Sequence, residues 1–131
     1  MKKPAPQLES LFQALGDRTR LRLLNLIADG EVCVCFFVEV LSEPQPKISR
    51  HLGVLRAAGL VAARRDGKWM HYRVTVPEEL APVFENVIAT LRTDPEMTRD
   101  RLALARACCS PRAPELLKRA PKPQIAATPP N

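Results

Sequence analysis

Residues 44–73, with the sequence PQPKISRHLGVLRAAGLVAARRDGKWMHYR, decide the fold of this chain. They carry seven lysine or arginine side chains and a single acid, Asp66, and seven minus one gives +6, the formal net charge of the whole 131-residue protein. The remaining residues therefore sum to zero charge. Positive charge concentrated on one segment is typical of a protein that binds a polyanion.

The first part of this segment has the pattern of an amphipathic helix. Ile48, Leu52 and Leu55 recur at helical spacing and predict one buried face. Pro46 suits the first turn of a helix, where its missing N–H is not needed, and Gly59 can end the helix in a left-handed conformation. Polar side chains remain on the other face, which indicates a recognition helix that enters the major groove of DNA.

The hydrophobic period changes after Gly59 from that of a helix to that of a strand. Residues 61–65 and 69–74 flank Asp66-Gly67, a two-residue hairpin signal. A recognition helix followed by a basic hairpin is the arrangement of a winged helix-turn-helix, whose wing contacts the DNA backbone. We therefore predict DNA-binding residues in both elements: Gln45, Lys47, Ser49, Arg50, His51, Arg64, Arg65 and Lys68. For His51, a packed ring is the alternative.

The residues before this segment predict three helices. The first covers residues 8–15, and the second is capped by Asp17 and stopped by Gly30. The third covers the apolar run at 32–41 and is the first helix of the helix-turn-helix, although periodicity alone does not separate a buried helix from a strand there.

Two more helices are expected after the hairpin. Residues 75–78 resemble a capping box, and Pro82 lies just inside a helix that extends to residue 93. A last helix opens at residues 94–96 and ends near residue 107. The fold class is thus mainly α with a β-hairpin, in one domain over residues 1–107, followed by a proline-rich flexible tail at 108–131.

A wide apolar face on the helix at 82–93 predicts a homodimer. A chain of this length has a modest core, and oligomerisation buries more apolar surface. We assign five residues to the dimer interface: Val83, Phe84, Val87, Ile88 and Leu91. Packing of the same face within one chain is the alternative.

Composition excludes several classes of protein. No run of about 18 apolar residues and no signal peptide is present, so we expect a cytoplasmic protein that does not enter a membrane. No Ser-His-Asp arrangement or phosphate-binding glycine loop stands out. We therefore expect no enzyme and no organic cofactor.

Four cysteines form two close pairs, Cys33 with Cys35 and Cys108 with Cys109. In a cytoplasmic protein such pairs favour metal ligands or sensors over a disulfide framework, and thiolates suit soft ions. Residues i and i+2 of a regular helix point about 200° apart. Cys33 and Cys35 can therefore hold one ion only in extended chain or at an irregular helix start, and binding should distort that start. The alternative is buried apolar cysteine for the first pair and functionless exposed thiols for the second.

The run GEVCVCFFVEVLSEPQPKISRHLGVLRAAGLVAARRDGKWMHYRV resembles the arsenic-responsive branch of the ArsR/SmtB metalloregulators. Three pieces carry the resemblance: Cys-Val-Cys at 33–35, QPKISRHL at 45–52 and GKWMHYR at 67–73. It covers roughly residues 8–107. It implies a homodimeric repressor on double-stranded operator DNA that dissociates when As(III) or Sb(III), the inducer, binds cysteine thiolates.

This sequence departs from the family pattern at two places. Members with this motif often carry a third cysteine three residues after the second, where this chain has Val38. Residues 82–93 also contain no His or Asp, unlike the dimer helix of the zinc sensors. The third ligand must then come from Cys108, Cys109 or a solvent thiol. Two other functions stay open: a Cd(II)/Pb(II)-responsive repressor that uses all four cysteines, and a thiol-based redox protein that uses Cys108-Cys109.

Overall fold

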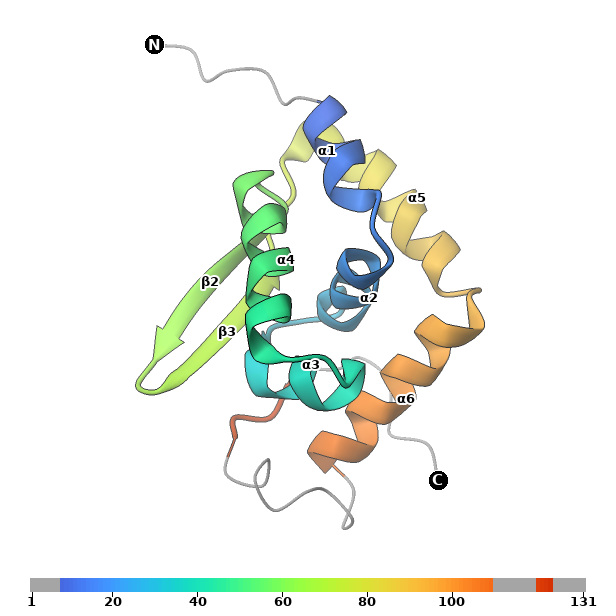
Figure 1. Cartoon of the computed structure of the whole chain (residues 1–131). Coiled ribbons are helices and arrows are strands. Elements are labelled where there is room, and N and C mark those ends of the chain that lie inside the picture. The colour runs from blue at the N-terminus through green and yellow to red at the C-terminus, as the bar shows by residue number, and fades with distance from the viewer. Residues whose placement is uncertain (1–7, 110–119, 124–131) are drawn as a thin grey trace.

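A computed structural model of the chain describes residues 8–109, without the side chain of Cys109, and residues 120–123 (Figure 1). Over these residues it contains α1 (Leu8–Leu15), α2 (Arg18–Ile27), β1 (Val32–Cys33), α3 (Val34–Leu41), α4 (Gln45–Ala57), β2 (Val61–Asp66), β3 (Trp69–Val74), a 3-10 turn (Glu78–Leu80), α5 (Ala81–Leu91) and α6 (Pro95–Cys109). The fold is mainly helical with a basic hairpin, which confirms the expected winged helix-turn-helix.

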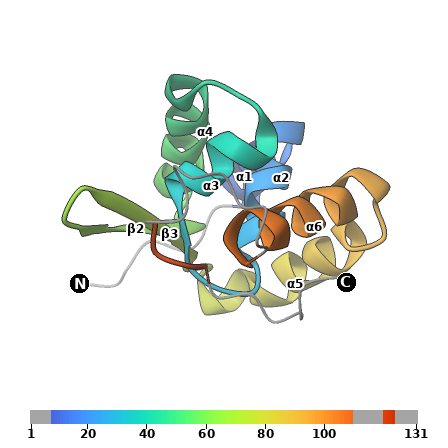
Figure 2. The ribbon, with the colours of Figure 1, turned by 90° about the horizontal axis from the view of Figure 1, so that it is seen from below.

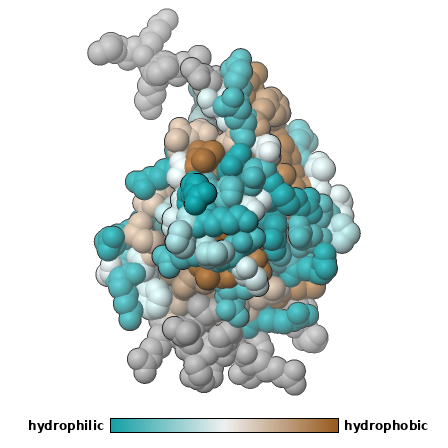
Figure 3. Space-filling view, in the orientation of Figure 1, coloured by the Kyte–Doolittle hydropathy of each residue, from teal (hydrophilic) through white to brown (hydrophobic). Residues whose placement is uncertain are grey.

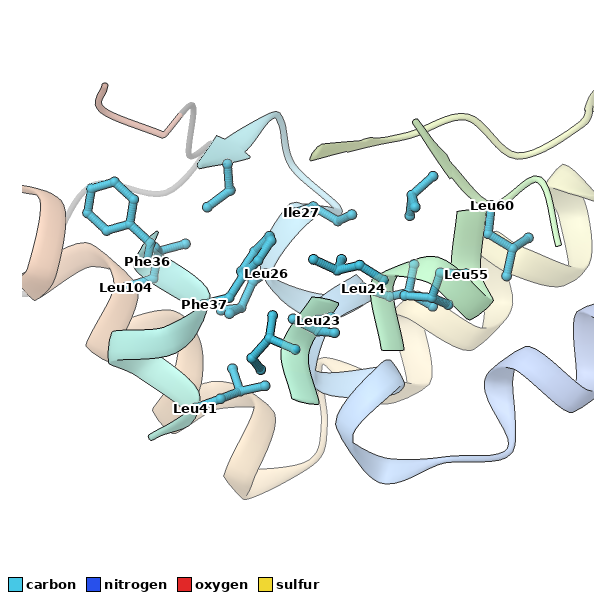
Figure 4. Packing of buried hydrophobic residues seen from close by; sticks show 14 of the residues in the cluster. Leu23, Leu24, Leu26, Ile27, Phe36, Phe37, Leu41, Leu55, Leu60 and Leu104 are labelled. Atoms are coloured by element: carbon cyan, nitrogen blue, oxygen red, sulfur yellow. The ribbon is translucent and has the colours of Figure 1, made fainter. Parts of the chain in front are cut away.

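The helices form one body, and the β2–β3 hairpin projects from it (Figures 1 and 2). Helices α2, α3 and α4 meet in the core, where Leu23, Phe37 and Leu55 are each fully buried (Figure 4). Helix α6 packs against α3 and α2. This packing holds α4 by its apolar face and leaves its polar face outward.

Local signals at the helix ends behave as the sequence predicts in three places. Asp17 caps α2, and its carboxylate accepts a hydrogen bond from the backbone N–H of Arg20 at 3.1 Å. Gly59 has a φ of 78°, in the left-handed region that ends α4. Pro82 lies in the first turn of α5. The Thr75-to-Glu78 capping box is not formed, because Pro77 precedes the 3-10 turn and Thr75 instead donates to the Gly59 carbonyl at 3.4 Å.

The prediction of a helix over the whole of residues 32–41 is wrong at its start. Val32 and Cys33 form a short strand that pairs antiparallel with β3, opposite Tyr72 and His71, and the helix begins at Val34. The sheet therefore has three strands in the order β1-β3-β2. The edge of β3 provides backbone partners that an isolated helix start would lack.

The hairpin turn lies one residue later than predicted. Asp66 pairs with Trp69, so the two loop residues are Gly67 and Lys68. Gly67 has a φ of 61° and occupies the first central position, where a two-residue hairpin with glycine first requires a positive φ.

Candidate DNA-binding surface and thiol pair

Helix α4 presents its polar face to solvent, as a recognition helix must. Gln45, Ser49 and Arg50 are exposed, whereas Ile48 on the opposite side is fully buried. The Lys47 side chain is partly buried and forms an ion pair, because its ammonium lies 3.0 Å from the carboxylate of Glu43, four residues earlier. The surface over this part of the molecule is mostly hydrophilic (Figure 3). Exposed polar side chains of this kind are the ones that read base edges in a major groove.

His51 lies on the inner side of α4 rather than among the exposed residues. Its Nδ1 atom is 3.2 Å from the guanidinium of Arg20 and 3.7 Å from the carboxylate of Asp17. Arg20 also donates to the carbonyls of Gln13 and Ala14. This favours the packed ring over a DNA contact, and it connects α4 to the end of α1 through one arginine.

The three basic residues predicted for the wing occupy different positions. Arg65 is exposed on β2, and Lys68 lies at the turn with its ammonium 5.0 Å above the ring of Trp69. Arg64 is also exposed but forms an ion pair with Glu31 at 2.6 Å. Arg64 and Arg65 are successive strand residues and point to opposite faces of the sheet.

Cys33 and Cys35 lie together at the junction of the sheet and the helix-turn-helix. Cys33 belongs to β1 and has an extended backbone, with φ −73° and ψ 142°, while Cys35 is in the first turn of α3. Their sulfur atoms are 3.2 Å apart, and the Cys35 thiol donates to the Cys33 sulfur. The irregular start that two close ligands require is thus already present, so α3 need not unwind for both sulfurs to face one ion.

The two thiols differ in acidity. The hydrogen bond from Cys35 lowers the pKa of Cys33 to about 6, against the opposing effect of burial, and the backbone N–H groups of Cys35 and Met70 and the nearby His71 also lower it. The same hydrogen bond and burial raise the pKa of Cys35. The pair is therefore one thiolate and one thiol at neutral pH, and a thiolate is the form that binds soft ions.

The two sulfurs lie close enough to bond one ion. Two sulfurs bonded to one ion at about 2.3 Å lie about 3.3 Å apart for a bond angle near 90° and about 3.8 Å apart for a tetrahedral angle. The hydrogen-bonded thiols, 3.2 Å apart, are already near that range. The described residues contain no group of three or more His, Cys, Asp or Glu side chains that could hold a metal ion. Within this part of the chain the site offers two thiol groups.

Cys108 belongs to α6, the helix that packs against α3. Leu104 of α6 is beside Phe36 of α3 (Figure 4), and Cys108 follows Leu104 by one helical turn in α6. Cys108 is fully buried and disulfide-bonded, and its backbone carbonyl accepts a hydrogen bond from Lys122. The side chain of Cys109 lies outside the described residues. The structure therefore brings Cys33 and Cys35 together and does not place Cys108 on them as a third ligand.

The apolar face of α5 is divided between two surroundings. Three of its residues, Phe84, Ile88 and Leu91, are at least nine-tenths buried against the core of the same chain. This is the packing within one chain that was the alternative to a dimer interface. Val83 and Val87 are only partly buried and line a groove together with Phe12 of α1, which is 56% exposed. Hydrophobic residues gather along this α1 and α5 edge (Figure 3). The exposed Phe12 was not among the predicted interface residues, although its helical spacing from Leu8 is readable in the sequence.

Comparison with known proteins agrees with this geometry. Residues 17–63 match the family model described as "Bacterial regulatory protein, arsR family". The chain is 43% identical over 91 residues to the arsenic resistance transcriptional regulator ArsR2 of Pseudomonas putida, which covers 69% of this chain and 78% of that protein. It is 50% identical over 66 residues to the arsenical resistance operon repressor of Escherichia coli, and the match spans 50% of this chain but only 56% of that protein.

A solved structure supports the same assignment. The homodimeric winged helix-turn-helix DNA-binding domain Mb0332 of Mycobacterium bovis superposes with a TM-score of 0.56 at 26% identity, over 72% of this chain and 94% of that one. The fold and the exposed recognition helix define a winged helix-turn-helix regulator. Within that class, the chain belongs to the ArsR family of bacterial regulatory proteins. Among the described residues, none of the helices has the length and apolar character needed to cross a membrane.

Proposed function

We propose that this protein is a transcriptional repressor that binds operator DNA as a homodimer and dissociates when As(III) or Sb(III) binds its cysteine thiolates. The observation that carries this proposal is the thiol pair, whose sulfurs lie 3.2 Å apart at the junction between the wing and the helix-turn-helix. The names of the Escherichia coli and Pseudomonas putida relatives support an arsenical as inducer. No covalent chemistry is required of the protein, and we propose no enzymatic activity.

The position of the pair suggests how binding reaches the DNA-binding surface. Cys33 belongs to the strand that pairs with β3 of the wing, and Cys35 belongs to the helix that leads into α4. An ion held by both sulfurs replaces the hydrogen bond between them with bonds of fixed length and angle. Because the two sulfurs already lie close enough for one ion, the displacement that moves the wing relative to the helix-turn-helix would come from the third ligand, which the ion must draw toward this junction.

We propose that the third thiolate comes from Cys108 or Cys109, of the same protomer or of the partner. Trivalent arsenic takes three thiolates, and the described residues around the pair offer two. Because Cys108 is disulfide-bonded here, this role requires its reduced form.

The homodimer would form through α1 and α5. The groove at Phe12, Val83 and Val87 remains open in the single chain, and these side chains come from two helices that run along one edge of the molecule (Figure 1). A two-fold dimer through this edge would place two α4 helices on one operator. We place the protein, with its DNA, in the cytoplasm.

The test is release of the chain from the DNA upstream of its own gene, measured by fluorescence anisotropy against As(III), Sb(III), Cd(II), Pb(II) and Zn(II). We expect release by As(III) and Sb(III), with three thiols per protomer lost in a thiol titration. Release by Cd(II) or Pb(II) alone, with all four thiols lost, would instead establish the sensor of those ions.

Variants separate the roles of the two cysteine pairs. Cys33→Ser and Cys35→Ser should retain operator binding and lose release by arsenite. Cys108→Ser and Cys109→Ser should each weaken release in part, and the double variant more. If the double variant loses all As–S absorbance while Cys33→Ser retains it, arsenic binds the Cys108-Cys109 pair first and the Cys33-Cys35 assignment is wrong.

A further inference from the structure

Arg64 of the wing is held by a carboxylate that the sequence did not single out. Its Nη2 atom donates to Oε1 of Glu31 at 2.6 Å, and its Nε atom lies 3.2 and 3.3 Å from the two carboxylate oxygens. The Nε and Nη2 groups of Arg64 are thus both engaged by Glu31. A guanidinium recognises phosphate through the same paired donors, so a carboxylate in this position competes with a DNA phosphate.

The sheet register explains why Glu31 reaches Arg64. Cys33 of β1, His71 of β3 and Arg64 of β2 are aligned across the three strands, and Glu31 precedes Cys33 by two residues. Residues directly opposite each other in neighbouring strands share a face of the sheet. The carboxylate of Glu31 also lies 3.7 Å from Nδ1 of the buried His71. Glu31 therefore lies within ion-pair distance of both Arg64 and His71 on this face.

Glu31 remains an anion in this position. Its carboxylate accepts hydrogen bonds from Nη2 and Nε of Arg64 at 2.6 to 3.3 Å. The ion pair nevertheless remains accessible, since half of the Arg64 side chain is exposed. Exposed ion pairs of this kind are weak, so a DNA phosphate can displace the carboxylate. The free energy needed to break the ion pair then lowers the affinity for DNA.

We propose that Glu31 is a positioning residue that holds Arg64 away from the DNA backbone, so that the wing makes fewer phosphate contacts than its three basic residues would allow. This inference rests on the proposed DNA-binding function. It separates Arg64 from Arg65 and Lys68, which no described carboxylate pairs with at ion-pair distance. Glu31 lies two residues before Cys33, immediately before the strand that joins the thiol pair to the wing.

The test is the salt dependence of binding to a short DNA duplex of arbitrary sequence, since phosphate contacts do not depend on sequence. Glu31→Gln keeps the size of the side chain and removes its charge. Asp29→Asn is the matched control, because Asp29 has the same 22% side-chain exposure, pairs with Arg92 instead, and its replacement changes the net charge equally. Arg64→Ala and the double variant Glu31→Gln/Arg64→Ala complete a cycle.

We expect Glu31→Gln to steepen the slope of log K against log salt by about 0.9, the value for one added phosphate contact, and to tighten binding about eightfold at 0.1 M salt. Asp29→Asn should give a much smaller change, and the gain should vanish in the double variant. Equal effects of Glu31→Gln and Asp29→Asn, weaker binding by Glu31→Gln, or a gain that persists without Arg64 would each overturn the inference while DNA binding itself stands. A wild-type chain that binds no duplex would overturn the proposed function as well.

Discussion

Replacement of Cys35 by alanine should abolish the acidity of Cys33. In the structure the Cys35 thiol donates across 3.2 Å to the Cys33 sulfur, and this hydrogen bond is the main reason that the pKa of Cys33 is lowered to about 6. At pH 7 a group with that pKa is about nine-tenths thiolate, whereas a thiol at the ordinary value of about 8.5 is about 3% thiolate. Alanine removes the donor and leaves the burial, so the thiolate fraction should fall by about thirtyfold.

The assay is the ultraviolet absorbance of the thiolate as a function of pH, taken as the difference between wild type and variant. Cys35→Ser is the matched control, because its hydroxyl can still donate to Cys33 while the second sulfur is lost. We expect the serine variant to keep a low transition and the alanine variant to move toward about pH 8.5. A transition near pH 6 in both variants would refute the hydrogen bond as the cause and assign the shift to backbone N–H groups and His71.

Four further outcomes are expected. The lowered pKa of Cys33 stabilises the folded state fully above about pH 8.5, and this stabilisation is lost as the pH falls through about 6. The free energy of unfolding of the wild type, measured by chemical denaturation, should therefore decrease over that window, and that of Cys35→Ala should decrease less. Arg65→Ala should weaken binding to all sequences and flatten the salt slope by about 0.9, and an unchanged slope would contradict its place at the backbone. Val87→Glu should give a folded monomer in sedimentation, whereas Ile88→Glu should unfold the chain because that side chain is only 8% exposed. Asp17→Ala should lower the free energy of unfolding by about 1 kcal/mol through loss of the α2 cap, and an unchanged value would show that the cap is replaced by water.

Local signals predicted the elements whose ends they define. Asp17, Pro82 and Gly59 each act within a few residues of their own position, through a cap, a first turn and a left-handed residue, and each does so in the structure. The hairpin was found for the same reason, although its turn lies at Gly67 and Lys68 because strand pairing extends to Asp66.

Features that depend on distant partners were not readable from local pattern. The strand at Val32 and Cys33 exists because β3 offers a free edge about forty residues later, and an apolar run without periodicity carries no sign of that edge. Helical spacing likewise identified the apolar face of α5 but not which chain covers it, so Phe84 and Ile88 were assigned to a partner and lie in their own core. Glu31 was missed because a single acid before a strand has no pattern of its own.

The location of the thiol pair within three consecutive residues also has a kinetic consequence. When one sulfur has captured an ion, the second is already 3.2 Å away, so the second bond forms within the same encounter and almost no chain must be ordered for it. An ion that loses one of the two bonds is recaptured before it can diffuse away. In the proposed mechanism, the lifetime of the bound state would then depend on the third ligand, which would come from a distant part of the chain, from the partner or from solvent. The rate at which the operator is reoccupied after exposure ends would be governed by that third ligand rather than by the pair that first captures the ion.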